Sequence, residues 1–325
     1  MSLLDIYCKF YIESADIQLS LTPFPDTDTK VFSIVDPLES KNNFCLHLNL
    51  KNILRKKYKI PNETLVSLHK SNLQKAIRLG NRAAALTSLD WLFNSHPIGL
   101  FRRLPIILIE DSCLHLYSPL IVIYSIAYEY IDPKFDKIIY SQLKQVVLDT
   151  IENKIHQRTI VYKTEKKEDI DFLQNLDKQR LFMFVRYCYG GLPGDMKMLQ
   201  QFIQVPNLYY TVPNKSLLKL EIDKNEVRYL LETVDFHVFP NILTELQIEL
   251  EKNKIHIDKN TIKSTMWNCR SRSNFREEFV CVVPQWWNNL KPYVDKLSKQ
   301  YWDIYLSVKK VEIKKPNTLL NYFSK

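Results

Sequence analysis

The residues near the C-terminus have the chemistry of an apolar plug. Leu319 is followed three and four positions later by Tyr322 and Phe323. One turn of 3₁₀ helix contains about three residues, so it would bring these three side chains to one side of the segment. Short peptides of this kind bind by placing apolar anchors in a groove of a partner protein. The lysines that precede them suit an acidic or phosphate-bearing surface: Lys309, Lys310, Lys314 and Lys315.

The segment from Lys314 to Lys325 resembles the PIP box, the peptide by which many replication and repair proteins bind the PCNA sliding clamp. Leu319 stands at the aliphatic position of that motif, and Tyr322 and Phe323 stand at its aromatic positions. The motif has a Gln three positions before the aliphatic residue, where this chain has Pro316. The resemblance implies a PCNA-like partner for the three side chains. The alternative is that the aromatic rings dock on their own domain.

Two basic segments have the chemistry to contact nucleic acid. Guanidinium groups hold phosphates through paired hydrogen bonds and stack on bases. Three of them alternate with Ser, Asn and aromatic residues, at Arg270, Arg272 and Arg276. A second basic run, free of acids, contains Arg55, Lys56 and Lys57. The formal charge of +9 and the pI near 9.0 fit a polyanionic partner, so we expect both segments to contact DNA.

Each basic segment also has a structural interpretation. In the first, a surface helix would use its arginines to cover Glu277 and Glu278. In the second, the cations would belong to a solvated loop. Both alternatives remain open at the level of sequence.

Asp235 and His237 form a motif that could do acid–base chemistry. In an extended segment the two side chains face the same side, so the carboxylate could orient the imidazole. The structural interpretation, which we favour, makes Asp235 a helix cap or turn residue. The motifs Gly-x-Ser-x-Gly and His-Glu-x-x-His are absent from the sequence. We therefore predict no catalytic residue.

Glu110 and Asp111 could ligate a divalent metal, although adjacent residues on a helix point about 100° apart. Arg102 and Arg103 precede them across an apolar run, so ion pairs are the favoured interpretation. No metal site and no cofactor is predicted.

Hydrophobic periodicity predicts a mostly α protein. Alternation between Ile6 and about Leu50 indicates strands. Beyond Pro61 the period is helical, and we expect a helical main domain with a small β-containing N-terminal region. The predicted helices cover residues 72–79 and 82–94, one starting at Ser118, 196–203 with Asp195 as its cap, and one from Asp258 to about Arg272.

These elements predict three regions: a β-rich region over residues 1–60, a helical domain over 61–306 and a flexible basic tail over 307–325. Three of the five glycines fall at Gly190, Gly191 and Gly194. They indicate either a tight helix–helix turn, which we favour, or a ligand loop.

Residues 73–111 resemble the helical region that follows the ATPase core in clamp-loader-related AAA+ proteins. The resemblance lies in a basic helix (73–81), an alanine-rich helix (83–86), Phe-Arg-Arg-Leu at 101–104 and Ile-Glu-Asp at 109–111. The ATPase motif Gly-x-x-x-x-Gly-Lys-Ser/Thr is absent from the sequence, so no ATPase activity is implied.

The six cysteines are scattered without a Cys-x-x-Cys pair, which fits a reducing compartment better than a disulfide framework or a zinc site. The longest apolar run, 114–130, contains polar residues and predicts a buried helix rather than a membrane span. We also expect no export signal at the N-terminus, and hence an intracellular, nuclear or replication-site location. The Lys, Asn, Ile and Tyr content is typical of an A+T-rich, for example viral, genome.

The sequence therefore predicts an accessory factor in DNA replication or repair whose partners are DNA, a PCNA-like sliding clamp and other replication proteins. Two alternatives remain. One is a metal-dependent, nuclease-like enzyme that the clamp brings to its substrate. The other is a protein-interaction scaffold whose positive charge is incidental.

Overall fold

The computed structural model describes residues 4–25, 28–39, 42–50, 62–153, 173, 175–204, 210–222, 225–271 and 286–312. The chain divides into two compact units, each made of two stretches of sequence. Unit 1 comprises Met1–Lys59 and Leu92–Glu221, and unit 2 comprises Ile60–Trp91 and Ile222–Lys325.

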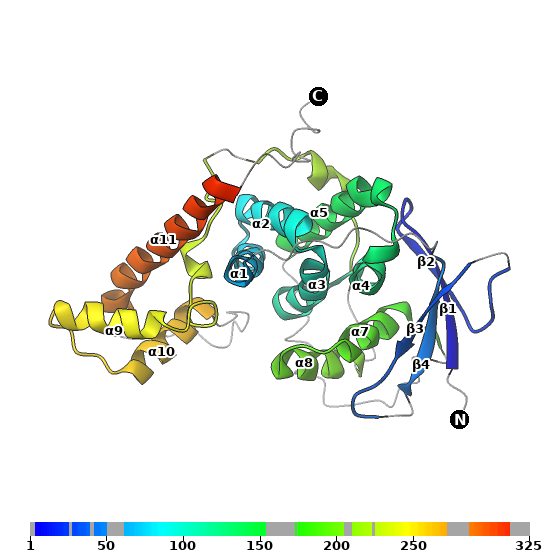
Figure 1. The fold of residues 1–325 in the computed structure, drawn as a ribbon, viewed down its shortest axis with the longest axis horizontal. Helices are drawn as coiled ribbons and strands as arrows, with labels where there is room; N and C mark the ends of the chain where they lie inside the picture. Colours follow the sequence, from blue (N-terminus) through cyan, green and yellow to red (C-terminus); the bar gives the residue numbers. More distant parts are fainter. Residues whose placement is uncertain are drawn as a thin grey trace. The chain divides into compact units, whose positions relative to one another are not determined.

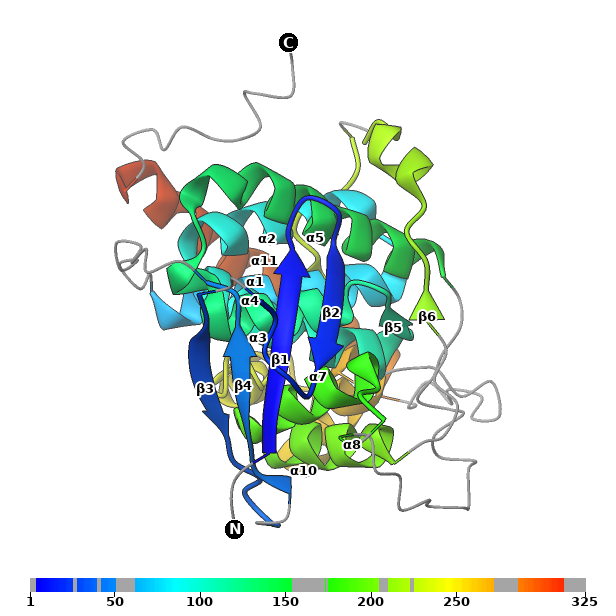
Figure 2. The ribbon, with the colours of Figure 1, turned by 90° about the vertical axis from the view of Figure 1, so that its right-hand side faces the viewer.

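A four-stranded sheet forms the N-terminal part of unit 1. Its strands are β1 (Leu4–Tyr11), β2 (Asp16–Ser20), β3 (Lys30–Ile34) and β4 (Phe44–Leu48), in the order β2-β1-β4-β3. The central pair, β1 and β4, is parallel, and both outer pairs are antiparallel. Figure 2 shows the four strands side by side. The alternation expected from the sequence is confirmed, because Ile6, Cys8 and Phe10 of β1 are buried while their neighbours are not.

The rest of unit 1 consists mainly of helices in its described part. They are α3 (Pro97–Asp111), α4 (Ser118–Ala127), α5 (Asp136–Glu152), α7 (Lys178–Cys188) and α8 (Pro193–Ile203), with the short 3₁₀ helices η2 (Tyr128–Tyr130), η3 (Pro133–Phe135) and η4 (Lys215–Lys219). Two short strands, β5 (Leu114–His115) and β6 (Tyr210–Thr211), pair in parallel. Phe44 of β4 meets Phe184 of α7 with ring centroids 6.0 Å apart. Farther inside, Phe101 packs on Tyr124 and Tyr128.

Unit 2 is helical in its described part. It contains α1 (Glu63–Leu79), most of α2 (Arg82–Ser95), η5 (Leu231–Thr233), α9 (Ile242–Lys252), α10 (Lys259–Met266), the π-helical turn η6 (Trp267–Ser271) and α11 (Trp287–Glu312). Figure 1 shows α9, α10 and α11 as a group, and their apolar faces share one core that includes Leu246, Leu290 and Trp302. The Trp302 indole donates to the Leu230 carbonyl at 2.9 Å, so this buried N–H is satisfied.

Several helix boundaries agree with the sequence predictions. Helix α2 spans Arg82–Ser95, and α4 begins at Ser118. Asp258 caps α10, because its carboxylate accepts from the Asn260 and Thr261 amides at 3.0 Å each. The apolar run 114–130 is mostly buried within unit 1.

Two boundaries differ. The helix predicted for 72–79 begins at Glu63, because Asn62 caps it by accepting from the Thr64 and Leu65 amides. The residue preceding α8 is Leu192, with Pro193 in the first turn, so the prediction of Asp195 as the cap is wrong. Asp195 lies in the first turn of α8 instead, where a negative charge is favoured.

The two units do not follow the predicted domain boundaries. Helices α3 to α8 belong with the sheet, while α1 and the start of α2 belong with residues after 222. The fold is rich in helix but mixed α/β, rather than all-α. Residues 307–312 belong to α11 and not to a tail, and residues 313–325 lie outside the described part of the chain. No described helix has the length and apolarity needed to cross a membrane.

Candidate nucleic-acid interface

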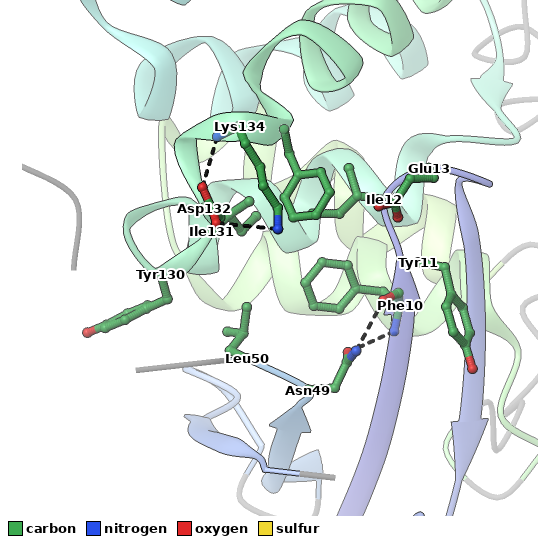
Figure 3. Close-up of a pocket in the computed structure, with 11 residues that line it drawn as sticks. Phe10, Tyr11, Ile12, Glu13, Asn49, Leu50, Tyr130, Ile131, Asp132 and Lys134 are labelled. Carbon is green, nitrogen blue, oxygen red and sulfur yellow. Dashed lines mark hydrogen bonds and ion pairs between the residues drawn. The ribbon is translucent and has the colours of Figure 1, made fainter. Parts of the chain in front are cut away.

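A pocket of about 280 Å³ lies in unit 1, where β1 and β4 end beside the segment that contains η2 and η3 (Figure 3). Its apolar floor consists of side chains that are almost fully buried: Phe10, Ile12, Leu50 and Ile131. Period-2 alternation explains why Phe10 faces the pocket while Tyr11 lies on the other side of β1, as Figure 3 shows. The pocket therefore depends on the register of the sheet.

Asn49 locks the strand ends that form one wall of the pocket. Its Oδ1 accepts from the Phe10 amide at 2.8 Å, and its Nδ2 donates to the Phe10 carbonyl at 3.2 Å. These bonds extend the β1–β4 pairing past its last ladder pair, Cys8 with Leu48. An Asn side chain can donate two hydrogen bonds and accept two. At the wall of the pocket, Asn49 Oδ1 can therefore accept one more hydrogen bond and Nδ2 can donate one more.

The opposite wall begins with a capped turn. The Asp132 carboxylate accepts from the Lys134 amide at 2.9 Å, and Pro133 follows it at the first position of η3. This geometry holds Lys134 and Phe135 beside the pocket. In Figure 3 the Lys134 side chain extends from the turn toward the space between Ile131 and Phe10.

Two ammonium groups lie over aromatic rings that line this pocket. The Lys134 Nζ atom is 4.9 Å from the centroid of the Phe135 ring, and the Lys30 Nζ atom is 3.5 Å from that of Tyr130. Lys134 also forms a 3.6 Å ion pair with Asp132, yet its side chain is 67% exposed. An exposed ion pair of this kind contributes little and can exchange for another anion. The pocket thus combines an apolar floor, a fixed amide and one lining cation, Lys134.

Acidic residues also line the pocket, namely Glu13 and Asp132. They limit where a negatively charged ligand can approach, because like charges repel. A phosphate would be placed on the side of Lys134, away from Glu13. The arrangement is suited to binding a flat ring that has an anionic group attached.

A second cationic cluster in unit 1 surrounds the turn between α7 and α8. Arg186 donates through Nε to the Arg102 carbonyl at 2.7 Å and through Nη1 to the Gly190 carbonyl at 2.8 Å. Burial lowers the pKa of Arg186 to about 10. Arg103 pairs with Asp195 at 2.9 Å, and burial raises the pKa of that Asp195 carboxyl.

This cluster supports the structural interpretations made from the sequence. Gly190, with φ of 73°, lies in a tight helix–helix turn, as favoured. Arg103 also lies 3.8 Å from Glu110, which confirms the expected ion pair. We therefore interpret Arg103 and Arg186 as structural residues that stabilise the turn between α7 and α8.

Asp235 is a buried turn residue, as favoured from the sequence. Its carboxylate accepts from the His237 amide at 2.9 Å, from the Ser271 hydroxyl at 2.9 Å and from the Lys75 ammonium at 2.5 Å. Burial would raise the pKa of Asp235, but the charge of Lys75 and the hydrogen bonds hold that pKa below its ordinary value. The His237 Nδ1 atom lies 3.4 Å from the same carboxylate.

Two of the carboxylates considered for chemistry have cationic partners: Lys75 for Asp235 and Arg103 for Glu110. Among the described residues, no group of three or more His, Cys, Asp and Glu side chains could hold a metal ion.

The residues predicted to contact nucleic acid or the clamp fall mostly outside the described part of the chain. This applies to Arg55, Lys56, Lys57, Arg272, Arg276, Leu319, Tyr322 and Phe323. Arg270 is described, and its side chain is 1% exposed. It forms an ion pair with Asp295 and lies 5.5 Å from the Trp287 ring centroid. Arg270 thus lies inside unit 2 and pairs with Asp295, while Glu277 and Glu278 lie outside the described part of the chain.

The pocket residues were not singled out by the sequence. Phe10, Asn49 and Lys134 come from three separate stretches, and each is ordinary in its local context. The one local signal was Asp132-Pro133, which is typical of a capped turn.

Comparisons with protein-family models, with curated proteins and with solved structures found no match for this chain.

Proposed function

We propose that this protein is an accessory factor in DNA replication or repair that binds nucleic acid and is recruited to a sliding clamp through its C-terminal segment. The observation that carries the nucleic-acid part is the pocket of unit 1, which is lined by aromatic rings and by Lys134, whose ammonium lies over the Phe135 ring. Aromatic rings that stack on bases, next to cations that neutralise phosphates, are the chemistry of nucleic-acid binding without sequence preference. The formal charge of +9 supports the same partner.

The clamp part of the proposal is supported by the spacing of Leu319, Tyr322 and Phe323. A plug of three side chains buries little surface and binds weakly by itself. Attachment to the same DNA would raise its effective concentration at the clamp. The proposed place of work is therefore the site of DNA replication inside the cell, the nucleus where there is one.

A pull-down with the cognate sliding clamp tests the recruitment. We expect the intact chain to be retained, and the Tyr322→Ala/Phe323→Ala variant to be lost, because the aromatic anchors supply most of the buried surface. Asn321→Ala is the matched control, since it changes a neighbouring residue that is not an anchor. Equal retention of the intact chain and the double variant would contradict the proposal, as would no retention of either.

Fluorescence anisotropy with labelled DNA tests the nucleic-acid part. Affinity should fall steeply as salt rises, because phosphate contacts release counterions. Absence of binding at low salt would contradict direct DNA contact and favour an interaction scaffold.

A further inference from the structure

We infer that the pocket at the ends of β1 and β4 takes a single unpaired base of a DNA strand, so that the protein prefers single-stranded to duplex DNA. This inference rests on the proposed function and names the form of DNA that its site would take.

The size of the pocket limits the ligand to one ring system. Its volume of about 280 Å³ lies just below the range of roughly 300–1,000 Å³ that is usual for drug-sized ligands. One base fits this description, with its sugar and phosphate left at the mouth. A whole strand could not enter, so the pocket would hold the base of one nucleotide at a time.

The walls match the faces and edge of a base. Phe10, Ile12 and Ile131 are between 2% and 7% exposed, and they provide an apolar surface for a flat ring. The Asn49 amide is fixed by its two bonds to Phe10 and retains a donor and an acceptor for a base edge. Phe135 is half-buried at the pocket, so its ring can contact a ligand without first being uncovered.

The charges match the phosphate that would stay outside. The Lys134 ammonium forms an exposed 3.6 Å pair with Asp132 and lies over the Phe135 ring, and a phosphate could replace the Asp132 carboxylate. Lys30 lies 3.5 Å from the centroid of the Tyr130 ring but does not itself line the pocket, so Lys134 is the lining cation. An apolar peptide side chain would use the floor equally well but would gain nothing from the charge of Lys134. Nucleic acid is therefore the better match.

The preference for a single strand follows from the cost of reaching the pocket. A base in a duplex is stacked and paired, and bringing it out costs a few kcal/mol. An unpaired base avoids most of that cost. The pocket should therefore discriminate between the two forms of DNA without reading their sequence.

Three probes of equal length test the inference by anisotropy: a single strand, its duplex and an abasic single strand with the same phosphates. We expect the single strand to bind at least about tenfold more tightly than either of the others. Phe135→Ala should weaken binding of the normal single strand about 5- to 150-fold, which is the range of base–aromatic stacking, and leave the abasic strand unaffected. A circular-dichroism melt of Phe135→Ala checks that it folds.

Lys134→Gln provides a second test that does not touch the core. It should reduce the slope of log affinity against log salt by about 0.7, the value for one phosphate contact on a single strand. Lys215→Gln is the matched control, because Lys215 is equally an exposed lysine of unit 1 but does not line the pocket. Its slope should equal that of the unchanged protein.

The outcomes separate the two proposals. If the three probes bind equally and both pocket variants behave like the unchanged protein, the inference about the pocket is wrong while DNA binding stands. That result would also be expected if the pocket takes a peptide side chain. If none of the probes binds at low salt, DNA binding itself is contradicted.

Discussion

The Lys75 ammonium and the Asp235 carboxylate lie 2.5 Å apart with their side chains 7% and 4% exposed. Burial lowers the pKa of Lys75, and the nearby Asp235 charge opposes that shift. The pair ties α1 to the loop before α9, because Lys75 also donates to the Glu232 carbonyl. The attraction between the two charges thus offsets the cost of burying each of them inside unit 2.

Asp235→Asn should destabilise unit 2 by about 3–5 kcal/mol, because it leaves the Lys75 charge buried without its carboxylate. The double variant Lys75→Met/Asp235→Asn should lose less than the sum of the two single variants. Urea unfolding followed by tryptophan fluorescence measures this, since all five tryptophans lie in unit 2.

The matched control is Lys296→Gln, which removes the more exposed pair between Lys296 and Glu249 in the same unit. It should change the free energy of unfolding by about 1 kcal/mol or less. Additive losses in the double variant, or equal losses for the buried and exposed pairs, would contradict the assigned role of Asp235.

The lowered pKa of Asp235 also predicts a dependence on acid. A carboxylate whose folded pKa lies below its unfolded value of about 3.9 binds fewer protons when folded. Its contribution to stability is complete above that value and is lost as pH falls toward the folded pKa. The free energy of unfolding of the unchanged protein should thus decline more steeply below about pH 4 than that of Asp235→Asn. Parallel declines would show that Asp235 does not contribute in this way.

At the scale of elements, α1 ends in a conformation that needs glycine. Gly80 has φ of 73° and ψ of 18°, and its amide is bonded to the Ala76 and Ile77 carbonyls. A Cβ atom there would meet nothing within 4 Å, so the requirement comes from the backbone and not from crowding. The left-handed end lets the chain turn from α1 into α2 after a single residue, Asn81.

Gly80→Ala should lower the free energy of unfolding of unit 2 by about 1–2 kcal/mol, because an L-residue with a Cβ is strained at this φ. Gly80→Asn is the matched control, since Asn adopts the left-handed region more readily, and its loss should be smaller. Urea denaturation again reports the difference. Equal effects of the two substitutions would mean that the backbone conformation is not the cause.

At the scale of the whole molecule, the proposed functions use separate parts of the chain. The pocket lies in unit 1, and the segment proposed to bind the clamp follows α11 in the sequence. A substitution that abolishes DNA binding at the pocket should therefore leave clamp binding unchanged, and a substitution in the C-terminal segment should leave DNA binding unchanged. Linking them through one DNA molecule should make binding to clamp-loaded DNA tighter than binding to either partner alone.

On clamp-loaded single-stranded DNA with a primer end, Tyr322→Ala/Phe323→Ala should lose at least about tenfold in affinity, while its binding to free single strands stays unchanged. Lys134→Gln should show the opposite result: its binding to free single strands should weaken, while its retention in a clamp pull-down should stay normal. Competition anisotropy and the pull-down measure the two effects. Loss of free-strand binding in the tail variant would show that the two functions are not separate.

Part of the fold could be predicted because it depends on neighbours in the sequence. The cap at Asp258 uses the amides two and three residues later, and the strand alternation from Ile6 to Ile12 has a period of two. The predicted helix starts were wrong where an earlier residue in the sequence could also begin the helix. Pro193 starts α8 before Asp195 can cap it, and Asn62 starts α1 well before Asn72.

The candidate site could not be predicted in the same way. Asn49 follows Phe10 by 39 residues, and Lys134 comes much later in the sequence. Strand pairing and the capped turn bring the three residues to one pocket. Arg270 looked like a phosphate contact because its sequence neighbours are polar. Its burial against Asp295 depends on a helix 25 residues away.

By itself, the sequence determined the alternating strands, half of the described α-helices, the positive charge and the motif that resembles a clamp-binding peptide. All of these depend on composition or on residues a few positions apart. The tertiary structure alone decided which helices join the sheet in unit 1, which charges are buried as pairs, and where a pocket forms. Those outcomes depend on contacts between distant segments, such as Lys75 with Asp235 across 160 residues, which no local pattern records.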